Sequence, residues 1–434
     1  MHRNSLSRFY LILLLIVTAC DESSTSKEDP QEPERRGQTV NPVEFGLLDI
    51  DPSISADGSK IVFLSGRDDI LKAYKFESGG TEPSRLTDVD LGSEGKAELS
   101  PDGKWVLLTV TSEGSSQLYA QSFTDAAVRT LVDEEEGSWD FAPSVSPGAN
   151  PLIVFKKKSE EEGRIFDLVS SKITDGGTSV TVSDSVAVPG TTVGEDFARF
   201  RTVNSGYELI TVQHDVDTNA FVSRGVSSGT VSSTFSEIAT DLSGIRPAHF
   251  DVGGTQLFTA VHLNDRKELD VVLTEGDEVE INTQEQVKSF DFSGGGNNEL
   301  DLPVIGVQDI SVARDTDNAL VLGQEYFSCP NYVGWGSVIS LWDPANSGFV
   351  KLLLVKTDVG WNLQSDPCSG FEEGAEKQPV NTQISKIRLA NTAGSGFNVV
   401  LQTWYKGDPE ILHLRFGWDG SKLTNRAVTD VSQN

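Results

Sequence analysis

Two short segments carry oxygen-bearing side chains at alternating positions, a pattern typical of calcium-binding loops. They are His214–Asn219 (HDVDTN) and Arg314–Asn318 (RDTDN), and Ca²⁺ prefers such carboxylate and amide oxygens. Neither continues into an EF-hand, because the loop beginning at Asp215 has Ala220 where glycine is required and Val226 where the closing Glu should stand. Both segments fall at expected hairpin turns, where Asp and Asn are common for conformational reasons. A plain turn and a calcium ligand set therefore remain as alternatives.

Other catalytic patterns are missing from the sequence. The five histidines stand singly, at His2, His214, His249, His262 and His413. No His-Glu-x-x-His zinc motif occurs, and one Gly-x-Ser-x-Gly match, Gly225–Gly229 (GVSSG), follows an expected strand with no helical pattern after it. Two common hydrolase classes therefore lack their signature in its required context. We therefore predict no enzyme, while carboxylates assembled from distant loops leave a calcium-dependent hydrolase or lactonase as an alternative.

Two of the three cysteines suggest a cross-link. Cys329 and Cys368 both stand in loop-like sequence. In an oxidising compartment such a pair favours a disulfide, and two free thiols are the alternative. A zinc site would need more soft ligands than two thiols.

The elements that must position these residues repeat along the chain. Ser55-Ala-Asp57-Gly58 precedes one apolar run, Ser100-Pro-Asp102-Gly103 precedes a second, and a degenerate copy begins at Ser146. Asp57, Asp102 and Pro147 are spaced 45 residues apart. A fixed period of this size indicates stacked supersecondary units, and Asp-Gly suits a tight hairpin because Gly accepts positive φ.

Each unit is predicted to be a four-stranded antiparallel meander, because short runs of alternating apolar and polar residues are bounded by Gly, Asp, Ser and Pro. Seven segments match the third strand of the unit: 71–76, 117–123, 164–169, 220–224, 268–273, 337–342 and 410–416. We predict an all-β fold, a β-propeller with seven blades favoured and six as the alternative. A two-sheet sandwich is the other fold compatible with short, regularly spaced strands.

The first two units resemble TolB-type propeller repeats, which pair a Ser-Pro-Asp-Gly turn with an apolar strand and close on Leu-Thr. The matching segments are 51–63, 98–108 and Arg85-Leu-Thr-Asp88. TolB itself has six blades, so the seven third strands depart from the family. The resemblance implies a propeller and a partner in the cell envelope more firmly than a particular binding site.

In a propeller the loops that enter the first strands line one rim of the channel. By repeat phase this rim carries mostly acidic residues with two arginines: Asp49, Asp51, Glu94, Glu98, Asp140, Glu195, Asp196, Arg199, Arg246 and Asp309. We predict that it receives a basic or polar segment of a partner. A second candidate is the aromatic stretch Tyr326–Trp335 with Trp361, which would suit a glycan or small ligand, although packing between blades also explains aromatic residues.

The N-terminus predicts export. Arg3 and Arg8 precede an apolar run of about ten residues, too short to span a bilayer. The run ends in Thr-Ala-Cys20 and resembles a bacterial lipoprotein signal, which implies acylation of Cys20 and a membrane anchor. We expect residues 1–19 to be the signal peptide, 20–39 the lipidated Cys and a disordered acidic tether, and 40–434 the propeller.

The composition restricts the partners. The formal net charge is −30, from 65 acidic and 35 basic residues, which argues against nucleic acid or anionic lipid as a ligand. We therefore expect a lipid-anchored protein on the periplasmic or cell-surface side of a bacterial envelope, whose propeller is a non-catalytic scaffold for an envelope protein or lipoprotein. No cofactor is predicted, with calcium left open.

Overall fold

The computed structural model divides the chain into two units, Met1–Glu44 and Phe45–Asn434. The described residues all lie in the second unit: 48–89, 92–112, 115–136, 143–147, 150–158, 166–175, 180–189, 195–203, 206–214, 219–239, 245–262, 271–273, 279–281, 285–292, 297–300, 305–329, 332–344, 348–357, 360–365, 382–390, 396–405 and 408–432. Cys20 and the predicted signal peptide and tether lie outside them. No helix within these ranges has the length and apolar character needed to cross a membrane.

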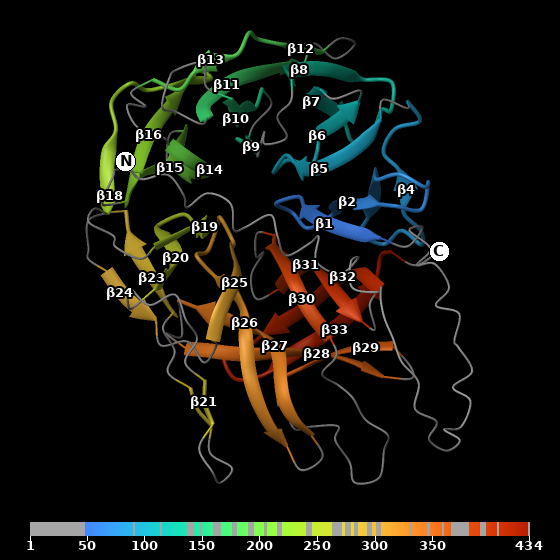
Figure 1. Cartoon of the computed structure of the whole chain (residues 1–434), viewed down its shortest axis with the longest axis vertical. Coiled ribbons are helices and arrows are strands. Elements are labelled where there is room, and N and C mark those ends of the chain that lie inside the picture. Colours follow the sequence, from blue (N-terminus) through green and yellow to red (C-terminus); the bar gives the residue numbers. More distant parts are fainter. Residues whose placement is uncertain are drawn as a thin grey trace, which may run out of the picture. The chain divides into compact units, whose positions relative to one another are not determined.

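The first three sheets follow one another along the chain (Figure 1). The first contains β1 (Asp49–Ile54), β2 (Lys60–Ser65), β3 (Lys72–Glu77) and β4 (Ser84–Arg85). The second contains β5 (Ser93–Leu99), β6 (Trp105–Ser112), β7 (Ser115–Ser122) and β8 (Arg129–Glu136). The third contains β9 (Ser144–Val145), β10 (Leu152–Lys158), β11 (Phe166–Asp175), β12 (Val180–Val182) and β13 (Val186–Ala187).

Four further sheets complete the described part. The fourth contains β14 (Glu195–Val203), β15 (Gly206–His214), β16 (Asn219–Ser227), β17 (Thr230–Val231) and β18 (Ser236–Ala239). The fifth contains β19 (Ile245–Val252), β20 (Gln256–His262), β23 (Glu285–Asp291) and β24 (Asn297–Leu300), with the separate hairpin β21 (Val271–Leu273) and β22 (Val279–Ile281). The sixth contains β25 (Ile305–Val312), β26 (Ala319–Cys329), β27 (Tyr332–Asp343), β28 (Gly348–Thr357) and β29 (Gly360–Gln364). The seventh contains β30 (Thr382–Leu389), β31 (Gly396–Tyr405), β32 (Asp408–Trp418) and β33 (Leu423–Asp430).

The repeated turn explains why each unit begins as it does. The Ser55 hydroxyl donates to Asp57 Oδ1 over 2.5 Å and accepts the Lys60 backbone N–H over 3.0 Å. Ser100 makes the same two contacts, to Asp102 Oδ1 over 2.7 Å and from the Trp105 N–H over 2.9 Å. Gly58 and Gly103 sit at φ of 71° and 68°, where a Cβ would be strained. The side chains of the turn therefore fix its conformation, which explains why the same Ser, Asp and Gly recur in both units.

Apolar layers between neighbouring sheets form the core. Strand residues alternate, so each sheet presents one apolar face to the sheet before it and one to the sheet after it. A buried cluster lies at each of the seven junctions between consecutive sheets in the described part, including the junction of the seventh sheet with the first. The first strand of each sheet also contacts the first strand of the next, and β30 contacts β1. The sheets are therefore arranged radially, with their first strands at the centre (Figure 1).

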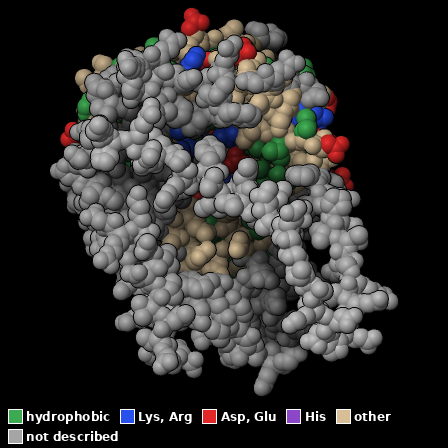
Figure 2. Space-filling model, in the orientation of Figure 1, with side chains coloured by type: hydrophobic (Ala, Val, Ile, Leu, Met, Phe, Trp, Pro, Cys, Tyr) green, Lys and Arg blue, Asp and Glu red, His purple; other side chains and the backbone are tan. Residues whose placement is uncertain are grey.

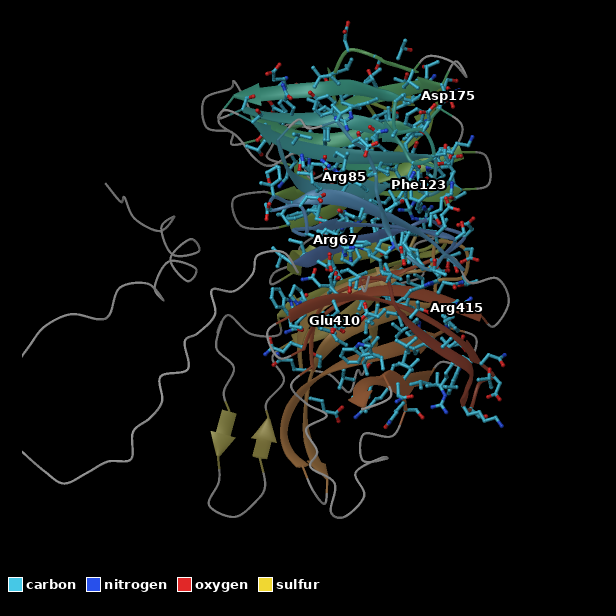
Figure 3. All side chains as sticks on the ribbon, turned by 90° about the vertical axis from the view of Figure 1, so that its right-hand side faces the viewer. Arg67, Arg85, Phe123, Asp175, Glu410 and Arg415 are labelled. Atoms are coloured by element: carbon cyan, nitrogen blue, oxygen red, sulfur yellow. The ribbon has the colours of Figure 1, made fainter. Side chains whose placement is uncertain are left out.

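Among the described strands, the first and last sheets meet without exchanging one, since each sheet comes from one continuous part of the chain. Ile61 and Phe63 pack with Val400, Ile411 and Val431 in one cluster. Figure 3 shows these two sheets side by side, in blue and red, and labels Arg67 on the blue sheet.

Arg67 joins the two sheets by polar contacts as well. Its guanidinium donates to the Asp49 carboxylate over 3.2 Å and to the Ser432 carbonyl over 3.0 Å. It also lies over the Tyr74 ring, 4.5 Å from the ring centroid. Because one side chain contacts both sheets, it supports the apolar cluster that closes the junction.

These observations confirm the predicted all-β β-propeller; the seven-blade ring stays a prediction. One third strand was predicted wrongly. Residues 268–273 were assigned to that position in the fifth unit, but the strand is Glu285–Asp291, which pairs with β20 along its length. Val271–Leu273 instead pairs with β22 in an inserted hairpin. An alternating apolar run is equally typical of a third strand and of a strand in an inserted hairpin. The 45-residue spacing of the turns, which could have distinguished them, no longer holds in this part of the sequence.

Candidate functional site

The first strands that line the centre of the ring are irregular. Six of the seven, all except the short β9, shift register against their second strand. At two of these bulges a non-glycine residue has positive φ, Asp51 at 55° and Phe197 at 50°. Bulges redirect side chains and are common beside functional sites. The centre of the ring is therefore the first place to look for a site.

Charged side chains from six sheets gather there. This channel cluster consists of Asp51, Glu98, Arg199, Asp251, Asp309, Arg314, Lys386 and Arg388. Four are acidic and four are basic, in a chain whose formal net charge is −30. Figure 2 shows basic and acidic side chains close together in a hollow near the middle of the face in view. The centre is thus locally balanced in charge, unlike the molecule as a whole.

Three ion pairs organise the channel cluster. Lys386 pairs with Asp51, joining the seventh sheet to the first. Arg388 Nη1 lies 2.8 Å from Asp309 Oδ2, and these side chains are only 25% and 16% exposed. Arg199 Nε lies 3.8 Å from Asp251 Oδ1. Partial burial strengthens such pairs relative to surface ones, so the carboxylates of the predicted acidic rim are largely neutralised.

The same carboxylates bind the backbone of the next first strand. Asp251 Oδ2 accepts the Val312 N–H over 2.9 Å, and Asp309 Oδ2 accepts the Ile387 N–H over 2.9 Å. A first strand has no sheet partner on its inner side, so its N–H groups there need other acceptors. The carboxylates supply them and thereby hold neighbouring sheets at a fixed spacing.

One guanidinium in the cluster has unused hydrogen-bonding capacity. Arg314 lines a cavity of about 60 Å³, together with Glu98, Asp251 and Arg388. Its Nη1 atom is buried and has no hydrogen-bond partner among the described residues. Burial lowers the pKa of Arg314, and the carboxylates of Asp251 and Glu98 partly oppose that shift. Arg314 is therefore the described cation best placed to accept a new partner.

Arg388 behaves differently from Arg314. Burial lowers its pKa, but the carboxylates of Asp309, Glu98 and Asp251 outweigh burial and raise it overall. Arg388 is thus a permanently charged, fully engaged part of the cluster, which suits a positioning role better than a reacting one.

The predicted rim residues divide into three groups. Asp51, Glu98, Arg199 and Asp309 come together in the channel cluster. Asp49 and Glu94 are buried and hold neighbouring segments: Asp49 binds Arg67, and Glu94 accepts the Ala73 N–H. Asp140 lies outside the described residues, as do the side chains of Glu195, Asp196 and Arg246.

Burial raises the pKa of both buried carboxyls. For Asp49 the Ser65 hydroxyl and Arg67 oppose the shift, and for Glu94 the Ala73 N–H and Lys72 do so. Both groups therefore belong to the structure between sheets, and neither is presented at the rim.

Four members of the cluster, Asp251, Arg314, Lys386 and Arg388, were not identified from the sequence. Asp251 and the β30 residues stand late in their strands, beyond the entering loops that repeat phase singled out. A charged residue at the last position but one of a first strand, as Asp251 is in β19 and Arg388 in β30, is a signal that could have found two of them.

The predicted calcium loops have different outcomes. In the second loop Asp317 accepts hydrogen bonds from the Thr255 N–H over 2.9 Å, the Thr255 hydroxyl over 2.6 Å and the Gln256 N–H over 3.3 Å. These donors occupy the carboxylate that a calcium ion would need, so this loop acts as a contact between the fifth and sixth sheets. Residues 215–218 of the first loop lie outside the described part.

Most of the predicted disulfide and aromatic site residues lie outside the described part of the structure. Cys368 and the side chain of Cys329 fall outside it, as does the side chain of Trp335. Trp361 packs on the apolar layer between the sixth and seventh sheets and donates to Glu410 over 2.8 Å. For Trp361 the structure favours packing between sheets.

Known proteins offer limited comparison, and no family model matches the chain. An uncharacterized protein of Agrobacterium fabrum (strain C58 / ATCC 33970) is 25% identical over 138 residues, which are 32% of this chain and 47% of that protein. The chain therefore matches about half the length of this curated relative.

Solved structures similar to the chain include TolB and a β-propeller domain. TolB from Acinetobacter baumannii has a TM-score of 0.39 at 12% identity, covering 66% of this chain and 61% of its own. The β-propeller domain of the Trilobed protease from Pyrococcus furiosus has a TM-score of 0.47 at 10% identity, covering 89% and 96%. TolB and other propellers are thus among its structural neighbours, as the sequence resemblance predicted, and the likeness is one of architecture.

Proposed function

We propose that this chain is a lipid-anchored lipoprotein of the bacterial cell envelope, facing the periplasm or the cell surface. Its propeller serves as a non-catalytic scaffold that binds another envelope protein or lipoprotein. Cys20 carries the acyl chains, residues 20–39 form the tether, and Cys329 and Cys368 form a disulfide. The channel cluster is the contact site for the partner.

The observation that carries this proposal is the convergence of eight charged side chains from six sheets on one fixed centre. Their ion pairs and backbone contacts set their positions before any partner arrives. Preorganised polar groups lower the entropic cost of association. Such a surface suits recognition of another macromolecule.

The size of the central cavity supports the same proposal. At about 60 Å³ it is far below the roughly 300–1,000 Å³ of pockets that enclose small-molecule ligands. A partner segment laid across the mouth is therefore favoured over a substrate enclosed within it. Because Asp51, Asp251 and Asp309 are already paired, Arg314 offers free hydrogen-bonding capacity, and a polar segment with a carboxylate or amide oxygen fits it.

Cross-linking in intact cells tests the proposal. The anchored protein is captured by affinity, and mass spectrometry identifies what accompanies it. We expect one dominant envelope protein, reduced at least tenfold by Arg314→Gln and weakened by Cys20→Ala exported through an ordinary cleavable signal. Arg415→Gln is the matched control, because Arg415 is exposed on β32, and it leaves capture unchanged.

Three results would contradict the proposal. One is the absence of any protein above background, and another is capture that Arg314→Gln does not alter. The third is calcium held tightly by the purified protein, together with a hydrolytic activity that chelation removes. That result would favour the calcium-dependent hydrolase instead.

A further inference from the structure

Turns make hydrogen bonds across two of the described junctions between sheets, on the side where the first strands end. Between the first and second sheets, the Ala56 N–H donates to the Pro101 carbonyl over 2.8 Å, and Lys60 Nζ donates to the Gly103 carbonyl over 2.9 Å. Between the fifth and sixth, Asp317 binds the turn before β20. These contacts leave no room for a ligand at the outer end of the junction.

The junction between the third and fourth sheets is different. Its turn, residues 146–151, is the degenerate repeat without aspartate, and its Ser146 hydroxyl is used within the turn, accepting the Leu152 N–H over 2.8 Å. No hydrogen bond joins the described residues of this turn to β14–β18. The apolar layer below it is intact, with Leu152 and Val154 packed on Phe200 and Leu209. The apolar layer therefore holds the sheets together. Above it the described residues leave a gap that Lys172 spans, since a Cβ at Gly229 would lie 2.8 Å from the Lys172 Cδ.

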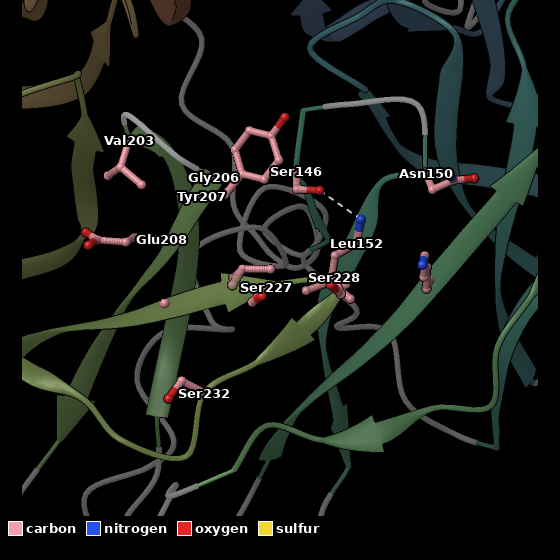
Figure 4. Close-up of a pocket in the computed structure, with 14 residues that line it drawn as sticks. Ser146, Asn150, Leu152, Val203, Gly206, Tyr207, Glu208, Ser227, Ser228 and Ser232 are labelled. Carbon is pink, nitrogen blue, oxygen red and sulfur yellow. Dashed lines mark hydrogen bonds between the residues drawn. The ribbon is translucent and has the colours of Figure 1, made fainter.

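A groove of about 950 Å³ occupies this gap (Figure 4). Tyr207 and Glu208 of β15 and Gly225–Ser227 of β16 line it on one side, and Ser146, Asn150 and Lys172 line it on the other. A Cβ added at Gly225 would meet nothing within 4 Å, so open space lies directly above the strand. The floor is made of glycine and serine, which lets a ligand approach the backbone closely.

The polar groups of the groove are available for a ligand. The Asn150 amide and the hydroxyls of Tyr207, Ser227 and Ser228 have no hydrogen-bond partner in the part of the chain that the structure describes, while Ser227 and Ser228 are exposed. Glu208 is already engaged by Arg201 over 3.0 Å and by the Ser223 hydroxyl over 2.9 Å. The free groups are thus mostly neutral and can both donate and accept.

This chemistry selects among ligand classes. A strongly anionic ligand would need more than the single ammonium of Lys172. An extended peptide would need an open strand edge, but β16 is already paired with β15 on one side and with β17 and β18 on the other. A neutral ligand rich in hydroxyl groups matches the free amide and hydroxyls, and the Tyr207 ring offers an apolar face to a pyranose. The volume lies within the range of about 300–1,000 Å³ seen for ligand pockets.

We propose that the groove between the third and fourth sheets binds a neutral oligosaccharide. The site is separate from the channel cluster, because the two share no lining residue. Binding here neither requires nor excludes a protein partner at the channel.

Isothermal titration of the purified full chain, kept in a detergent without a sugar headgroup, tests this site. The probes are chitohexaose, cellohexaose and maltohexaose, which cover β- and α-linked neutral sugars. We expect at least one to bind, Tyr207→Ala to weaken it at least tenfold, and Gly225→Leu to remove it by filling the groove. Thr181→Leu, an exposed strand position of β12, is the matched control and leaves affinity unchanged.

Near-ultraviolet circular dichroism confirms that each variant is folded before titration. No binding of the three sugars at millimolar concentration overturns the proposal. So does a sugar that binds Gly225→Leu and the unaltered chain equally well. Arg314→Gln leaves sugar binding unchanged in either case, which keeps this test distinct from the test of the channel.

Discussion

The junction of the fifth and sixth sheets and that of the third and fourth are built from the same layers but end differently. Both bury an apolar cluster between two antiparallel sheets. In the first, Asp317 reaches across and accepts three donors of the neighbouring turn. In the second, the turn keeps its hydrogen bonds to itself and a groove remains. Of these two junctions, the one with a carboxylate in its turn is closed by that side chain, and the one without it presents a groove.

In each junction the apolar layer and the turn contact have different roles, one in stability and the other in access to the space between the sheets. The apolar layer supplies most of the free energy of folding, since each fully buried large side chain contributes roughly 1.5–3 kcal/mol. The turn contact adds less but determines access. Junctions can therefore lose their turn contact, and gain a binding surface, at modest cost in stability.

The largest expected effect comes from removing the sealing residue. Asp317→Ala leaves the Thr255 and Gln256 N–H groups without their acceptor, and loss of a charged acceptor for several donors should lower the free energy of unfolding by about 3 kcal/mol. Urea unfolding measures it. Asp57→Ala is the control, because its contacts stay within one exposed turn; an equal loss there would refute the distinction between the two kinds of turn.

The same contact can be broken from the other side. A Cβ at Gly253 would lie 2.0 Å from Asp317 Oδ1, so Gly253→Ala forces the carboxylate away from its donors. We expect a loss of about 2 kcal/mol in the free energy of unfolding. Combined with Asp317→Ala it should cost less than it does alone, since the carboxylate is then gone and only the tight approach to the Cα of residue 317 remains. Simple additivity of the two losses would argue against a shared contact.

Acid should lower the free energy of unfolding through the seventh sheet, because His413 is buried there. The described lining of the groove contains no histidine and should not contribute to this effect. Burial, together with Arg415, lowers the pKa of His413 from 6.5 to about 4. Between these values the unfolded chain binds the proton more readily, so stability is complete above about pH 6.5 and falls as the pH drops toward 4.

The loss between pH 7 and pH 5 should be about 2 kcal/mol, since each pKa unit corresponds to roughly 1.36 kcal/mol. Urea unfolding of the protein and of His413→Leu at both pH values measures it. The variant should lose less than the unaltered chain by that amount. Parallel losses in the two proteins would exclude His413 as the source.

The channel cluster should show energetic coupling that the groove lacks. A double-mutant cycle of Asp309→Asn and Arg388→Gln isolates the pair, whose Nη1–Oδ2 distance is 2.8 Å. Partial exposure limits the expected coupling energy to about 1 kcal/mol. Asp309→Asn combined with Ser227→Ala serves as the distant pair and should be additive. Coupling in the distant pair would mean that the two regions are not independent.

The smallest effect is expected at the open junction itself. Gly225→Ala should change the free energy of unfolding by less than about 0.5 kcal/mol, because the added methyl group enters empty space and the residue lies within a strand. The same Gly→Ala substitution at Gly253 is the comparison. The difference between the two changes in free energy of unfolding measures how tightly the sealed junction is packed relative to the open one. A large loss at Gly225 would show that the groove is filled in solution.

Local features of the fold could be predicted from the sequence. Ser55, Asp57 and Gly58 act within a few residues of one another, so their spacing carries the whole hydrogen-bond pattern of the turn. Four members of the channel cluster were also identified, because repeat phase assigns them to the segments that enter the first strands, and the structure places them within those strands.

Their partners could not be found in this way. Arg388 and Asp309 are 79 residues apart, and Asp51 meets Lys386 only because the ring closes. Whether a carboxylate is free or neutralised depends on such pairings, and four of the predicted rim residues belong to a cluster that is balanced in charge. The groove was missed for another reason: it arises from a contact that one turn fails to make, and an absent contact has no sequence pattern of its own.

The junction between the first and last sheets has a consequence for assembly. Because no described strand crosses it, side-chain contacts hold the ring closed there, among them the apolar cluster around Ile61 and Ile411, the Lys386–Asp51 pair and the Arg67 contact with Ser432. Their loss would let the ring open into a curved row of sheets. An opened row would expose a complementary apolar face at each of its two ends. Two opened copies would satisfy those faces by closing on each other, so substitutions at Arg67 should favour swapped dimers over fraying, much as hinge variants do in other proteins.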